Sequence, residues 1–94
     1  MILLKNGEQN MNQNKMYDGE KILNDLGYIK VKYGKKVCFF DKQLKSCCYK
    51  IIFNIIDKTI SKIAVTDRSK FYHVEISSQE LAAISLICKG LEWI

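Results

Sequence analysis

The sequence predicts an α+β fold, an antiparallel meander sheet of about five strands with a short N-terminal helix and a C-terminal helix. Between residues 28 and 76, apolar and polar residues alternate in several short runs, which is the period of half-buried strands. Short polar turns separate these runs, so consecutive strands are expected to pair as antiparallel neighbours. The flanking segments place apolar residues at helical spacing. We expect both helices to pack on one face of the sheet and the other face to stay open.

The chain is expected to contain one domain, at residues 17–94. Residues 1–16 are rich in Asn and Gln, show no apolar period and are expected to be disordered or loosely attached. The Gly-Glu pair before Met11 has codons that can read as a bacterial ribosome-binding sequence, so translation could begin downstream of the first residue. The start stays open among three methionines, Met1, Met11 and Met16.

The N-terminal helix is expected to begin at Asp18, a good N-cap, and to stop at Gly27. A hairpin should follow at residues 28–41. In its first strand the inward side chains are expected to be those that alternate with lysines: Ile29, Val31 and Tyr33. In its second strand they are expected to be those that alternate with Cys38 and Phe40: Val37 and Phe39. Phe40 would then lie on the open face.

The strongest strand pattern is at residues 48–56, with a partner strand at 60–66. A three-residue loop would set Ile51 opposite Val65 and Phe53 opposite Ile63. This register pairs apolar with apolar side chains, and a slip by one residue would turn every side chain to the other face. It places the lysines of both strands on the open face.

The last strand is expected at residues 71–76, with His73 pointing outward. Ser77 and Glu80 have the spacing of a capping box, which predicts that a helix starts there and continues to about Lys89. The core side of this helix should carry the apolar residues at helical spacing: Leu81, Ile84, Ile87, Cys88 and Leu91.

Composition narrows the function classes. The net charge of +5 favours a polyanion or an acidic protein surface as partner, although basic residues can also serve solubility alone. No apolar run is long enough to cross a bilayer, and the four cysteines form no C-x-x-C pair. A reducing cytoplasm with free, buried thiols is therefore expected, with no metal site. No nucleophile turn or phosphate-binding loop is present, so we expect no enzyme and no cofactor.

Two candidate binding sites follow. The open sheet face is expected to carry a set of basic residues that could bind nucleic acid or an acidic partner: Lys30, Lys32, Lys50, Lys62 and His73. The alternative is a face that lysines merely keep soluble. The second candidate is an apolar patch near the C-terminus, which could bind a protein partner or a second copy: Leu86, Trp93 and Ile94.

Three segments carry a resemblance: YDGEKILNDLGY at 17–28, IIFNIIDKTISK at 51–62, and ISSQELAAI with LEW near the C-terminus. They resemble small uncharacterised phage and prophage proteins of low-GC Gram-positive bacteria. The resemblance implies a phage context. Together with the small size, the lack of a catalytic set and the expected basic open sheet, it favours a non-enzymatic accessory protein that binds a host or phage macromolecule, for example an anti-CRISPR-like inhibitor of a host defence nuclease. Two alternatives stay open, a direct nucleic-acid-binding protein and a homodimeric structural module.

Overall fold

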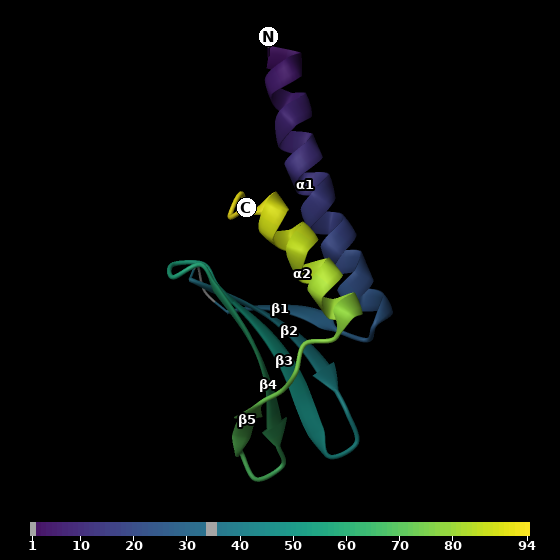
Figure 1. Cartoon of the computed structure of the whole chain (residues 1–94), viewed down its shortest axis with the longest axis vertical. Coiled ribbons are helices and arrows are strands. Elements are labelled where there is room, and N and C mark those ends of the chain that lie inside the picture. The colour runs from purple at the N-terminus through teal and green to yellow at the C-terminus, as the bar shows by residue number, and fades with distance from the viewer. Residues whose placement is uncertain (1, 34–35) are drawn as a thin grey trace. The chain divides into compact units, whose positions relative to one another are not determined.

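The computed structural model describes the backbone at residues 2–33 and 36–94 and the side chains at 14–31 and 36–94 (Figure 1). Along the described chain, one helix precedes five strands and a second helix follows them. The elements follow in the order α1 (Ile2–Asp25), β1 (Ile29–Tyr33), β2 (Val37–Gln43), β3 (Cys47–Asn54), β4 (Thr59–Thr66), β5 (Phe71–His73) and α2 (Ser78–Gly90).

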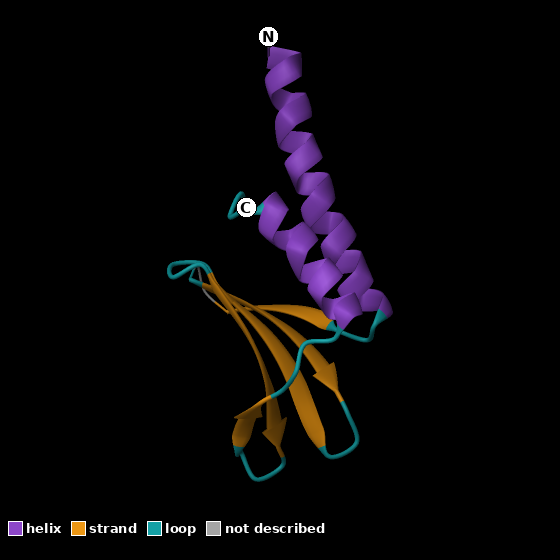
Figure 2. Cartoon of the chain, viewed as in Figure 1, coloured by secondary structure: helices purple, strands orange, loops and turns teal. Residues whose placement is uncertain are grey.

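The predicted α+β class and the antiparallel meander are confirmed. The five strands form one sheet in the order β1-β2-β3-β4-β5, and each strand pairs antiparallel with its neighbour in the chain (Figure 2). The chain divides into two compact units. One contains α2 and most of α1, and the other is the sheet unit, Leu23–Ile76.

Helix α1 begins much earlier than the sequence predicts. It starts at Ile2, so Asp18 is an exposed residue inside the helix and not its N-cap. The prediction failed because residues 2–16 have no apolar stripe, whereas many of them have good intrinsic helix propensity. The loose attachment of residues 1–16 stays a prediction.

The end of α1 matches the sequence. Gly27 adopts a φ of 101°, which residues with a Cβ atom rarely take. Its N–H donates to the Asn24 carbonyl at 2.9 Å, and the Tyr28 N–H donates to the Leu23 carbonyl at 2.9 Å. These two bonds form a Schellman motif, so the glycine stop is confirmed.

Helix α2 has the predicted capping box. The Glu80 N–H donates to the Ser77 Oγ at 3.1 Å, and the Ser77 N–H donates to the Glu80 Oε1 at 2.9 Å. The core side of the helix is confirmed at Ile84, Ile87 and Cys88, which are buried. Leu81 was expected in this stripe and is instead exposed.

Within the helical unit, α1 and α2 meet closely at Gly19. A Cβ atom at this buried position would lie 2.5 Å from the Ala83 carbonyl oxygen and 2.7 Å from the Ile87 Cγ1. Both distances are below van der Waals contact, so the absence of a side chain is what lets the two helices approach here.

The β3–β4 register differs by three residues from the predicted one. Ile51 pairs with Lys62 and Phe53 pairs with Ile60, across a turn at residues 55–58. Lys58 has a φ of 56° in this turn, and the Asp57 N–H donates to the Asn54 Oδ1 at 3.0 Å. Because three is an odd number, every β4 side chain lies on the face opposite to the predicted one.

One face of the sheet, here called the core face, carries the buried side chains of the strands. Its most buried side chains come from the central strands: Phe40, Ile51, Phe53 and Ala64. The Phe40 and Phe53 rings pack edge to face with centroids 5.7 Å apart. The outward placement of Phe40 was therefore wrong, as was the inward placement of Ile29, Val31, Val37 and Phe39. The side chain of Tyr33, also expected inward, lies outside the described residues. Tyr28 is buried directly before β1, so the inward alternation begins one residue earlier than predicted.

Candidate binding surface

The opposite face of the sheet, here called the Ile52 face, carries apolar side chains on all five strands. Directly paired residues of antiparallel strands share a face, so the registers assign its members. Its described apolar side chains are Ile29, Val31, Val37, Phe39, Ile52, Ile63, Val65 and Phe71.

The Ile52 face is open to solvent. Its apolar side chains on β2, β3 and β4 are half-buried. Ile29 on β1 and Phe71 on β5 lie at the two edges of the sheet, and each is 69% exposed. The same registers also place uncharged polar residues on this face: Gln43, Asn54, Thr59 and Ser61. Single exposed apolar residues are common, but apolar side chains on every strand of one sheet face are typical of a surface that binds another molecule.

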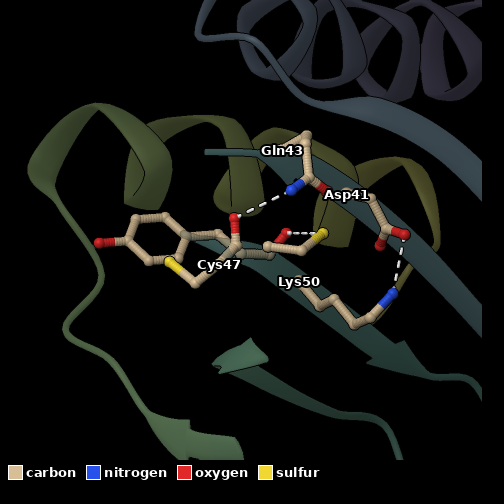
Figure 3. Close-up of polar contacts among 6 residues, drawn as sticks. Asp41, Gln43, Cys47 and Lys50 are labelled. Atoms are coloured by element: carbon tan, nitrogen blue, oxygen red, sulfur yellow. Dashed lines mark hydrogen bonds and ion pairs between the residues drawn. The ribbon is translucent and has the colours of Figure 1, made fainter. Parts of the chain in front are cut away.

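The charges on this face neutralise one another. Lys50 Nζ lies 2.8 Å from Asp41 Oδ2, and the two residues are direct partners across β2 and β3 (Figure 3). The same ammonium lies 5.9 Å from the centroid of the Phe39 ring. The second carboxylate oxygen, Asp41 Oδ1, is buried and has no hydrogen-bond partner. Among the described strand residues of the Ile52 face, Asp41 is thus the acidic side chain and Lys50 the lysine, and the two form an ion pair.

The predicted basic face is wrong, because its residues lie on both faces of the sheet. Lys30 pairs with Phe40 and Lys62 pairs with Ile51, which places both on the core face. Lys50 and His73 lie on the Ile52 face. For Lys32 the structure gives the backbone pairing with Cys38, and its side chain lies outside the described residues. A single stripe of lysines that follows a phosphate backbone is therefore not formed.

Lys62 has a structural position. Its side chain is only 7% exposed, and its Nζ donates to the Glu75 carbonyl at 3.0 Å. The ammonium also lies 4.7 Å from the centroid of the Tyr49 ring. These contacts hold the segment after β5 against the sheet, and they leave this lysine unsuited to contact a phosphate.

The C-terminal patch lies in the helical unit and is only partly exposed. Leu86 and Trp93 are half-buried, and the Trp93 backbone N–H donates to the Cys88 carbonyl at 2.9 Å. Ile94 is 75% exposed. The binding of a partner at this patch stays a prediction.

The thiols of Cys48 and Cys88 are not activated. Burial raises the pKa of the Cys88 thiol. Burial also raises the pKa of Cys48, the Asp41 carboxylate raises it further, and the Lys50 ammonium lowers it. Because a reactive thiol needs a lowered pKa, neither group is set up as a nucleophile at neutral pH. Among the described residues, no three His, Cys, Asp or Glu side chains are grouped so that they could hold a metal ion.

The sequence contained a signal for the Ile52 face. Ile63 and Val65 alternate with Lys62 and Ala64, and Phe71 alternates with Tyr72. If the inward alternation is started at Tyr28, the first hairpin places Ile29 and Val31 on this same open face.

None of the described helices is long and apolar enough to span a membrane.

Comparison of the chain with family models, curated proteins and solved structures gives no match. The resemblance to small phage proteins therefore stays a prediction, and the surface itself carries the functional argument.

Proposed function

We propose that this chain is a non-enzymatic binding protein that contacts another protein through the Ile52 face. The observation that carries the proposal is the run of apolar, solvent-accessible side chains over all five strands, with Ile29 and Phe71 exposed at its edges. Burial of such side chains contributes about 25 cal/mol per Å² of apolar area, which makes an apolar protein surface the favoured partner.

Charge supports a protein partner over a nucleic acid at this surface. Binding to DNA or RNA depends on cations that neutralise phosphates. On the Ile52 face the lysine is Lys50, and Asp41 already pairs with it. One version of this proposal is a phage accessory protein that inhibits a host defence nuclease. The nuclease would then be the protein partner.

An affinity capture from host lysate tests the proposal. The tagged chain is compared with a Phe71→Ser variant and with an Ile56→Ser control, whose residue is similarly exposed (65%) but lies in the β3–β4 turn. Each lysate is used with and without nuclease treatment, and bound proteins are identified by mass spectrometry.

We expect capture of a protein that withstands nuclease treatment, whether a lysate protein or an untagged copy of this chain added to the lysate. The Ile56→Ser variant should retain this protein, and the Phe71→Ser variant should lose it. Far-UV circular dichroism should show that both variants fold, because both substituted side chains are largely exposed. Capture that needs nucleic acid, or that Phe71→Ser keeps at full strength, would argue against this function.

A further inference from the structure

We infer that the partner of the Ile52 face is the Ile52 face of a second copy of this chain, so that two sheets pack face to face in a symmetric dimer. The inference rests on the proposed function and names the partner of the same surface. A symmetric interface brings the same patch together from both copies, so the patch must complement itself in charge and in shape.

Self-complementarity in charge is the first argument. The chain carries a net charge of +5, so two copies repel each other overall. The Ile52 face is different because the Asp41 carboxylate already neutralises the Lys50 ammonium at 2.8 Å. His73, at the edge of this face, is exposed. Among the described residues of this face, the lysine is Lys50, which Asp41 already pairs, so an acidic partner gains little here, whereas an equally neutral face fits.

Shape and area are the second argument. Two sheets pack well face to face, with their strands aligned to within about 30° and with interdigitating apolar side chains. With strands about 4.8 Å apart and a rise of about 3.4 Å per residue, this sheet offers a footprint of about 500 Å². Two copies would thus cover about 1,000 Å² in total, which is the lower limit for a specific protein interface.

The position of the edge residues is the third argument. Ile29 and Phe71 are the most exposed apolar side chains of the face, and they lie on the first and last strands of the sheet. A second sheet of equal width reaches both edges at once, so it covers both side chains. A single helix, about 10 Å wide, would cover only part of the roughly 20 Å width of the five strands.

Analytical ultracentrifugation of the full chain over a range of concentrations tests the inference. We expect a reversible dimer of twice the monomer mass. A Phe71→Lys variant places two like charges in the interface and should raise the dimer dissociation constant about tenfold or more, the equivalent of about 1.4 kcal/mol. Ile29→Lys should act in the same direction, because its side chain is equally exposed.

The matched control is Ile56→Lys, which adds the same charge at a similarly exposed position outside the Ile52 face. It should leave the dissociation constant within about twofold of the unsubstituted chain. Circular dichroism establishes that each variant folds before its mass is interpreted.

A chain that stays monomeric up to about 1 mM would overturn the inference. A dimer that neither Phe71→Lys nor Ile29→Lys weakens would overturn it as well. If the chain is monomeric but its lysate partner is lost with Phe71→Ser, the proposed function stands and only the identity of the partner is wrong. If the chain is monomeric and lysate capture ignores Phe71, both proposals fail.

Discussion

Replacement of Gly19 with leucine is expected to lower the free energy of unfolding by about 3 kcal/mol. The reason is the close approach of α1 and α2, since even a Cβ atom would lie 2.5 Å from the Ala83 carbonyl oxygen. The Ile87 backbone nitrogen, 3.0 Å away, closes the other side of the site. A leucine side chain has no room unless the two helices move apart. Urea unfolding followed by circular dichroism measures the loss.

The destabilisation expected from a side chain at position 19 is opposite in sign to the effect of helix propensity. A substitution at Gly19 therefore distinguishes crowding between the two helices from helix propensity. Alanine is about 1 kcal/mol better than glycine in a helix interior, so an uncrowded Gly19→Ala variant would be more stable than the parent. We expect Gly19→Ala to be less stable, because the Cβ contacts with Ala83 and Ile87 outweigh this gain.

Asp18→Ala is the matched control in the neighbouring position. Asp18 is exposed inside α1, so its replacement by alanine should be neutral or slightly stabilising. If the helix instead began at Asp18, loss of the N-cap would cost about 1 kcal/mol. A stabilising Gly19→Ala together with a destabilising Asp18→Ala would contradict the account of α1.

Replacement of Lys62 with threonine is expected to lower the free energy of unfolding by about 2 kcal/mol or more. The substitution removes the hydrogen bond from Nζ to the Glu75 carbonyl and the contact with the Tyr49 ring. It also removes an aliphatic stem that is buried on the core face. Chemical denaturation with fluorescence or circular dichroism detects the change.

Lys30→Thr is the control for this prediction. Lys30 is exposed on an edge strand, and threonine is a better strand former than lysine. We expect a change within about 0.5 kcal/mol. Equal, small effects at the two positions would mean that Lys62 is a solvated surface lysine, as the sequence alone had indicated.

Much of the fold could be predicted from local patterns. The Ser77–Glu80 capping box and the Gly27 stop are chemical signals that need no knowledge of the rest of the chain, and both are present in the structure. The five strands and their order follow from short turns between alternating segments. These features are local, so local reasoning was sufficient.

The faces of the sheet could not be assigned in this way, because both faces of β3 and β4 are rich in apolar residues. Polarity selects a register only where one face is apolar and the other polar. Here Ile63 could pair with Phe53 or lie on the opposite side, and apolar matching chose the wrong alternative. Lys62 made the choice of face harder still. Lysines are rarely buried without partners, so the sequence favoured a register that exposes Lys62, whereas this residue is buried.

The β3–β4 register decides which face of the sheet is open and which residues can bind a partner. Nuclear Overhauser contacts in the unmodified chain test this register directly. We expect contacts between the Phe53 ring and the Ile60 side chain, and between the side chains of Ile51 and Lys62. Contacts of Phe53 with Ile63 and of Ile51 with Val65 would contradict it, since they would return the lysines to the open face.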